Sequence, residues 1–146
     1  MDLREAKGLV WGNECLTTAD LATLGMLLPK CISLTCLDLH NNQIGDEGAT
    51  ALAAGVAASS SLATLGLSIN NIGDEGAKAL VAGVAASGSL TLLGLNNNNI
   101  GDEGAKALAA GVTASSSLVA LQLGNNKIGD EGAKRRWRPA LLPAAR

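Results

Sequence analysis

The sequence predicts an α/β fold: a right-handed βα solenoid with an inner parallel sheet, outer helices and about five repeats. Three observations support this prediction. The chain repeats itself every 28 residues, each copy contains the pattern LxxLxLxxNxI, and the residues GDEGA follow the isoleucine of each regular copy. Such a period is the signature of stacked structural repeats, each too small to bury its own apolar face. With 146 residues, the chain has the length of one domain.

The first half of each copy predicts a short strand. Leu37 and Leu39 have the period of two that a strand shows, and the same pair recurs in later copies. The asparagine after each strand faces inward in this layout, where a buried amide must find hydrogen-bond partners. The backbone of the neighbouring turns can supply them. We therefore interpret these asparagines as a structural ladder rather than as binding residues: Asn42, Asn70, Asn98 and Asn126.

The second half of each copy predicts a helix. Gly45 ends the strand, Asp46 is a favourable N-cap, and Glu47 suits the positive end of the helix dipole. Gly48 and Gly55 should weaken this helix by about 1 kcal/mol each relative to alanine. Its apolar face has helical spacing and consists of Ala49, Leu52, Ala53 and Val56.

Stacked strands lie about 4.8 Å apart whereas helices are about 10 Å across, so the array should curve with its strands on the concave side. The pattern LxxLxLxxNxI, with its 28-residue period and IGDEGA-type helix start, resembles the ribonuclease-inhibitor-like class of leucine-rich repeat. NOD-like receptors and the Ran GTPase-activating protein contain repeats of this class. The resemblance covers residues 6–134 and implies a horseshoe that binds proteins inside the cell.

We expect a leucine-rich-repeat domain over residues 1–134. Regular copies begin at Leu34, Leu62, Leu90 and Leu118. Residues 6–33 form a degenerate copy that lacks GDEGA but has Asp20 near its helix start. Apolar residues occupy its core positions, namely Leu9, Trp11, Leu16, Leu24 and Leu28. This copy is either a cap in which Trp11 covers the open end of the array, or a drifted or truncated part of a longer array.

Residues 135–146 form an atypical basic tail, RRWRPALLPAAR. A back-translation of this tail, read in another frame with free choice of the third codon bases, spells ALAAGVAASGS. That string is the end of the third copy with one valine changed to alanine. We therefore hypothesise a frame change after Lys134. The alternatives are a chance match and a genuine basic terminus.

Composition argues against several classes of function. The net charge of −2 gives no general reason to bind nucleic acid or an anionic membrane. The start MDLREAK is not a signal peptide, and the apolar run 21–28 is too short to span a bilayer. Cys15, Cys31 and Cys36 are odd in number and lack metal-ligand spacing. We expect a cytoplasmic protein without a cofactor.

The concave face offers the candidate contact residues. They are Cys36, Asp38, His40, Thr64, Gly66, Ser68, Leu92, Gly94, Asn96, Ala120 and Gln122. A cysteine, an aspartate and the only histidine on one face invite a catalytic or metal-binding interpretation. However, Cys36 and His40 are about 13 Å apart along the strand, and no acid, base or nucleophile recurs in later copies. The acidic pairs that begin with Asp46 lie on helices about 10 Å apart, too far to share one calcium ion. We therefore expect no enzyme.

The leading interpretation is a non-catalytic protein-protein interaction module, as part of a longer receptor-like or regulatory array. The alternative implied by the resemblance is a GTPase-activating regulator of a small GTPase. A third possibility is a degenerate copy without a present function. Because residues 34–134 contain no Trp, Tyr or Arg, the usual interface hot spots, a partner should bind weakly. The open sheet edges make self-association possible.

Overall fold

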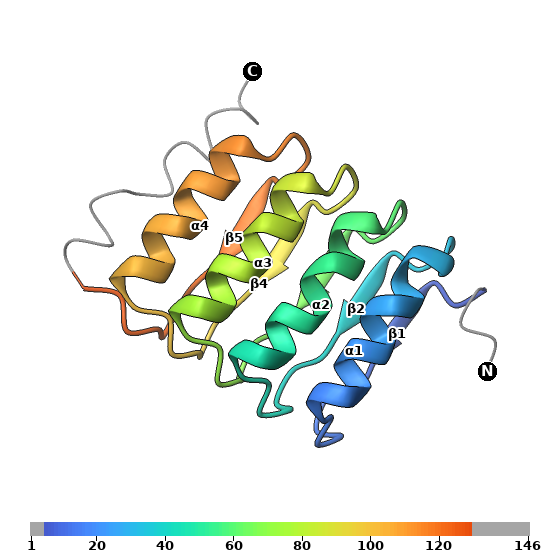
Figure 1. Ribbon diagram of the computed structural model, residues 1–146, viewed down its shortest axis with the longest axis horizontal. Helices are drawn as coiled ribbons and strands as arrows, with labels where there is room; N and C mark the ends of the chain where they lie inside the picture. Colours follow the sequence, from blue (N-terminus) through green and yellow to red (C-terminus); the bar gives the residue numbers. More distant parts are fainter. Residues whose placement is uncertain (1–4, 130–146) are drawn as a thin grey trace.

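The computed structural model describes residues 5–129 and shows one parallel sheet with its helices on one face (Figure 1). The strands are β1 (Gly8–Val10), β2 (Cys36–Asp38), β3 (Thr64–Gly66), β4 (Leu92–Gly94) and β5 (Ala120–Gln122). The helices are α1 (Thr18–Leu27), followed by the 3-10 turn η1 (Leu28–Lys30), α2 (Asp46–Ala58), α3 (Asp74–Ala86) and α4 (Asp102–Ala114). The strand order is β1-β2-β3-β4-β5. The predicted α/β solenoid is confirmed.

The core lies between the sheet and the helices. Strand register advances by one repeat per strand, so that Leu9 pairs with Leu37, and Leu37 with Leu65. The central leucines of β2, β3 and β4 and the helix leucines that face them are buried: Leu37, Leu65, Leu93, Leu52, Leu80 and Leu108. Burial of such a side chain contributes roughly 1.5–3 kcal/mol relative to exposure. Alternation along each strand leaves the flanking residues on the opposite face.

The asparagines form the predicted structural ladder. The side-chain oxygen of Asn42 accepts hydrogen bonds from the backbone N–H groups of Glu14 and Leu16, at 2.9 and 3.3 Å. Its Nδ2 donates to the carbonyls of Trp11 and Leu39, at 2.7 and 3.0 Å. Each amide thus joins its own turn to that of the preceding repeat, and the structural interpretation is confirmed.

A second polar ladder, which the sequence analysis missed, runs through the turns after the helices. The hydroxyl of Ser89 donates to the carbonyl of Leu62 at 2.8 Å, and that of Ser117 to the carbonyl of Leu90 at 2.8 Å. Ser61 bonds to the carbonyl of Leu34 in the same way, at 2.8 Å. The signal in the sequence was a recurring serine. Ser61, Ser89 and Ser117 come directly before Leu62, Leu90 and Leu118, the first leucines of three regular copies.

The expectation that Asp46 caps its own helix is wrong. The N-cap of α2 is Gly45, and Asp46 is the first helical residue. The Oδ1 atom of Asp46 instead accepts hydrogen bonds from the backbone N–H groups of Gly73 and Gly76, at 2.7 and 2.9 Å. These groups belong to the first turn of α3, where a helix has no partners of its own. Asp46 therefore caps the helix of the following repeat.

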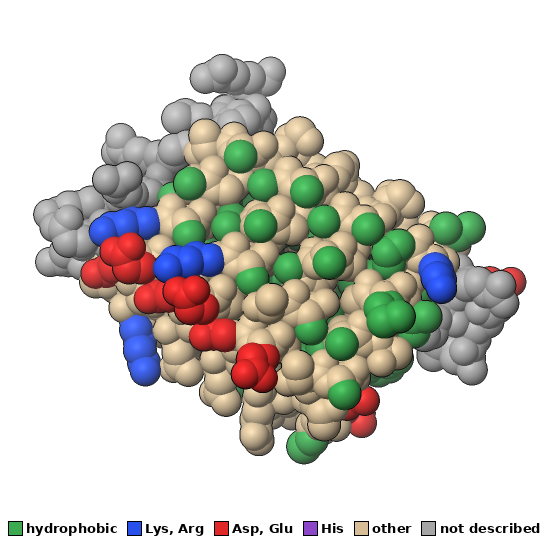
Figure 2. All heavy atoms as spheres, viewed as in Figure 1, with side chains coloured by type: hydrophobic (Ala, Val, Ile, Leu, Met, Phe, Trp, Pro, Cys, Tyr) green, Lys and Arg blue, Asp and Glu red, His purple; other side chains and the backbone are tan. Residues whose placement is uncertain are grey.

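The same arrangement recurs along the array. The Oδ1 atom of Asp74 accepts from Gly101 at 2.7 Å and from Gly104 at 2.9 Å. A Cβ atom on Gly104 would lie 2.6 Å from this oxygen, so the second glycine of GDEGA makes room for the carboxylate. Figure 2 shows acidic side chains along the rim where the helices begin. Asp46 and Asp74 are thus caps between repeats.

Replacing Asp46 with alanine should lower the free energy of unfolding by about 1–2 kcal/mol, because two partly buried amides of α3 lose their acceptor. Urea denaturation followed by circular dichroism measures the change. The matched control is Glu47→Ala, at the exposed neighbouring position. Equal stability of the two variants would refute capping between repeats.

Among the described residues with a left-handed backbone, Ile69 is the one with a β-branched side chain. Asn13, Asn41, Asn97 and Asn125 occupy equivalent positions with φ between 53° and 63°, which asparagine tolerates. Ile69 takes the corresponding place in the third repeat with φ of 57°, although it is β-branched and 49% exposed. The strain there has no apparent compensation from burial.

The variant Ile69→Asn should therefore be more stable than the parent by about 1 kcal/mol, the order of the penalty for a left-handed conformation. Thermal and urea unfolding test this expectation. Ile69→Val retains the branched side chain and should leave stability nearly unchanged. A loss of stability in Ile69→Asn would show that Ile69 packs favourably despite its exposure.

Candidate interaction surfaces

The sheet face opposite the helices, called here the open face, carries the residues that the strand alternation assigned to the concave side. Cys36, Asp38, Thr64 and Leu92 are each half-buried there. Gly94 also belongs to this face but is buried, because the side chains of Ser68 and Gln122 lie close to it. A Cβ atom added to Gly94 would lie 3.6 Å from the Ser68 hydroxyl oxygen and 3.4 Å from Oε1 of Gln122. The Oδ1 atom of Asn96 likewise accepts from the backbone N–H of Gly124, at 2.6 Å. The open face therefore carries polar side chains beside apolar ones, among them Leu92 and the 67% exposed Val10.

Asp38 and His40 contact each other on this face, which the sequence analysis did not foresee. The Nδ1 atom of His40 lies 3.1 Å from Oδ1 of Asp38, and its Nε2 atom lies 3.4 Å from Nδ2 of Asn13. The imidazole packs on the backbone of Gly12, where a Cβ would come within 2.1 Å of the ring. Such an aspartate–histidine pair resembles the base and its orienting group in a catalytic triad.

A nucleophile for this pair is missing within residues 5–129. The hydrogen-bond partners of the His40 ring there are Asp38 and Asn13, and neither has a hydroxyl or thiol. The same residues contain no group of three His, Cys, Asp or Glu side chains able to hold a metal ion. The described contacts of the pair thus join the turn of the first repeat to the strand of the second.

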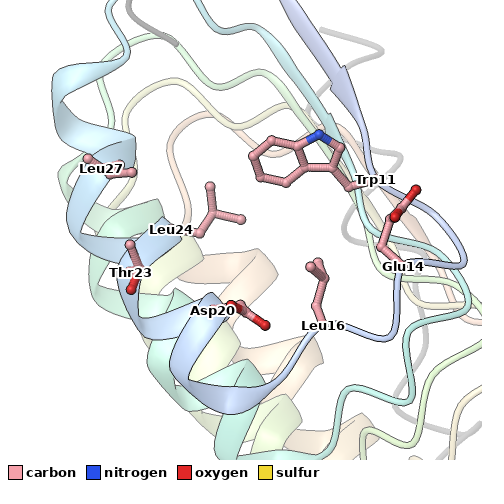
Figure 3. Close-up of a pocket in the computed structure, with 7 residues that line it drawn as sticks. All are labelled: Trp11, Glu14, Leu16, Asp20, Thr23, Leu24 and Leu27. Atoms are coloured by element: carbon pink, nitrogen blue, oxygen red, sulfur yellow. The ribbon is translucent and has the colours of Figure 1, made fainter. Parts of the chain in front are cut away.

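A cavity lies at the other candidate surface, the N-terminal end of the array. It has a volume of about 470 Å³ and lies between α1 and the segment after β1 (Figure 3). Its lining consists of Trp11, Glu14, Leu16, Asp20, Thr23, Leu24 and Leu27. Trp11 packs against the core at this end of the array and is partly buried. We call this cavity the end pocket.

The end pocket borders a helix cap of a different type. Thr17 is the N-cap of α1, and its hydroxyl accepts from the backbone N–H of Asp20 at 3.2 Å. The carboxylate of Asp20 in turn accepts from the backbone N–H and the hydroxyl of Thr17, each at 2.8 Å. These bonds, the backbone one above all, lower the pKa of Asp20 below its usual value.

A lowered pKa in the folded state means that the unfolded state binds the proton more tightly. The contribution of Asp20 to stability is therefore fully present above its unfolded pKa and disappears as the pH falls through the lower folded value. Thermal melts of the parent and Asp20→Asn should differ at neutral pH, and the difference should shrink below about pH 4. A difference that stays constant with pH would contradict a cap that depends on the ionised carboxylate.

The described chain is thus a stack of βα repeats with leucines inside, an asparagine ladder between its turns and an open sheet face. Such an arrangement defines the class of solenoid repeat proteins. A family model described as "Leucine Rich repeat" matches residues 30–53, 58–81, 87–109 and 114–135, more than half of the chain. The protein belongs to the leucine-rich repeat family.

Solved structures share this fold. The C-terminal domain of tropomodulin from Caenorhabditis elegans superimposes with a TM-score of 0.78 at 18% identity, over 94% of this chain and 86% of that one. Actin-Binding Site 2 of leiomodin-1 superimposes with a TM-score of 0.72 at 21% identity, over 82% of this chain and 71% of that one. A comparison with curated protein sequences finds no match. At these identities the likeness concerns the fold.

Activation of a small GTPase, the alternative implied by the resemblance, is not supported by these comparisons. Residues 5–129 also contain no arginine with which to complete a GTPase site as an arginine finger does. Within the same residues, no helix combines the length and the hydropathy needed to cross a bilayer. Residues 130–146, including the basic tail and its hypothetical frame change, lie outside the described part of the chain.

Proposed function

We propose that this protein is a non-catalytic protein-interaction module that binds its partner on the open face. The observation that carries the proposal is the sheet face from β1 to β5 that no described element covers, on the side opposite helices α1 to α4 (Figure 1). Five parallel strands in constant register form a rigid platform, and rigid elements hold contact residues more precisely than loops do.

The contact residues proposed for this surface are the polar side chains of the middle strands and their edges. Thr64 and Ser68 lie near the centre, flanked by Asp38 and His40 on one side and by Asn96 on the other. The side chains are short, and the face has hydrogen-bond donors and acceptors in place of aromatic anchors. Affinity should therefore depend on the area of contact rather than on one dominant residue.

Photo-crosslinking tests this proposal. A benzoylphenylalanine placed at Thr64, on the open face, should crosslink to a distinct protein in cells. The matched control places the same group at Ala82, which is exposed on α3 and so on the helical side. Equal crosslinking from both positions, or crosslinking from Ala82 alone, would reject the open face as the binding surface.

Actin is one concrete partner to test, since the leiomodin-1 structure is described as an actin-binding site. Co-sedimentation with actin filaments should be compared between the parent and Ser68→Trp, a change that would obstruct the middle of the open face. Binding by the parent that the variant loses would name the partner. Binding by neither protein would exclude actin and leave the crosslinking experiment to decide the function.

We also propose that the protein works in the cytoplasm. Cys15 is an exposed thiol and Cys36 a half-buried one, and neither forms a disulfide. Free thiols of this kind are usual in a reducing compartment. Fractionation of cells that express the full chain with a C-terminal epitope tag tests the location, and recovery from the secreted fraction would contradict it.

A further inference from the structure

The end pocket is open because its repeat has no described neighbour on one side. The regular-repeat counterparts of Trp11 and Leu16 are Leu39 and Ile44, each 28 residues later. These counterparts are only 0–2% exposed, whereas Trp11 and Leu16 are partly exposed. In the interior of the array the preceding repeat supplies the side chains that cover them. At the N-terminal end the same positions line a cavity of about 470 Å³, within the range of ligand-binding pockets.

Apolar side chains form most of the pocket wall. Figure 3 shows Leu24 and Leu27 on α1 facing the space that Trp11 and Leu16 border from the other side. Hydrophobic side chains also reach the surface over α1 in Figure 2, and Met26 is 74% exposed. An occupant must therefore bring apolar groups, because only these gain free energy by displacing water from such a wall.

The charged groups of the pocket are all of one sign. Glu14 enters from the segment after β1 and Asp20 from the first turn of α1, and no Lys, Arg or His among residues 5–129 lines the cavity. An aspartate is ionised at neutral pH, and the hydrogen bonds from Thr17 lower the pKa of Asp20 further. A second copy of the described N-terminal end would bring the same two carboxylates to the contact, and like charges repel. The complementary occupant is cationic.

We propose that the end pocket is a docking site for a basic amphipathic peptide segment of a partner protein. One or more leucine-like side chains of the segment fill the space against Trp11 and Leu24, and a Lys or Arg pairs with Glu14. This site lies at the end of the array and is separate from the open face. The two surfaces can therefore engage different partners, and neither proposal depends on the other.

Trp11 provides the readout. The chain has two tryptophans, so the full-length variant Trp137→Phe leaves Trp11 as the only indole. Titration with the synthetic peptide acetyl-KLLKLLKK-amide should change Trp11 fluorescence saturably, and added salt should weaken the binding. The peptide acetyl-ELLELLEE-amide should have at least about tenfold lower affinity, because it replaces attraction to the pocket carboxylates by repulsion.

Charge variants locate the binding. In the same background Glu14→Gln should weaken binding of the basic peptide by about threefold, and Glu14→Lys by about tenfold. The matched control Glu47→Gln removes an exposed carboxylate from α2, outside the pocket, and should leave the affinity unchanged. Equal effects of Glu14→Gln and Glu47→Gln, or no saturable fluorescence change, would overturn the proposal.

Sedimentation velocity of the free protein distinguishes a partner from self-association. A monomer whose Trp11 is accessible to acrylamide quenching agrees with a pocket that awaits a partner segment. A dimer that dissociates as Trp11 becomes accessible would show that a second copy occupies the pocket, and the proposal would be wrong.

Discussion

Replacing Asn70 with alanine should lower the free energy of unfolding by about 3 kcal/mol, the largest effect we expect from one polar substitution. The side-chain oxygen of Asn70 accepts from the backbone N–H groups of Asn42 and Ile44, at 3.0 and 2.9 Å. Its Nδ2 donates to the carbonyls of Leu39 and Leu67, at 3.2 and 3.0 Å. Each buried group left without a partner costs about 1–3 kcal/mol, and alanine leaves several.

Urea denaturation of the full chain measures this loss, and two further variants interpret it. Asn71→Ala changes the exposed neighbour of Asn70 and should cost little. Asn70→Asp retains the acceptor but replaces the donor with a second oxygen that faces carbonyl groups, so it should also be strongly destabilising. If Asn70→Ala and Asn71→Ala were equally stable, the ladder would be irrelevant to the stability of the array.

The second large effect is expected at Gly55, where alanine should lower stability by about 2 kcal/mol even though alanine favours a helix. An added Cβ would lie 2.3 Å from the carbonyl oxygen of Gly25 and 2.7 Å from its Cα. These are backbone atoms of α1, which cannot move aside as a flexible side chain does. Alanine gains about 1 kcal/mol in helix propensity. The separation of α1 from α2 should outweigh this gain and leave a net loss of about 1–3 kcal/mol.

Gly88→Ala is the control for Gly55→Ala. A Cβ on Gly88 would meet no atom within 4 Å, and its counterparts in neighbouring copies are Ser60 and Ser116. This substitution should be neutral or stabilise the protein slightly, because it reduces the freedom of the unfolded chain. Thermal unfolding compares the two variants. A Gly55→Ala variant as stable as Gly88→Ala would mean that the helix contact is loose.

Local patterns in the sequence were sufficient for the elements and for the interior ladder. Leucines with period two specify the strands, and alanine-rich segments after GDEGA specify the helices, since both patterns act within a single copy. Asn42 and its counterparts were identified as structural because identical copies must stack in register. Each asparagine side chain then meets equivalent backbone groups of the preceding repeat, as Asn70 meets the N–H of Asn42 and the carbonyl of Leu39.

The pattern within one copy does not predict how closely the helices of neighbouring repeats approach each other. Asp46 has the sequence signature of an N-cap for its own helix, yet its carboxylate lies closer to the N-terminus of α3. Gly55 looked like a defect in a helix, whereas it is the point where α1 and α2 touch. The contact between Asp38 and His40 depends on how the two side chains bend toward each other.

The sequence by itself determined the repeat, its strands and helices, the leucine core and the asparagine ladder, because these follow from one copy and its period. Only the tertiary structure decided which helix each aspartate caps, why the glycines are needed and where the array leaves a pocket. Those features arise from lateral packing between repeats. The degenerate first repeat has no described neighbour on its outer side, so its pocket follows from the packing and not from the period.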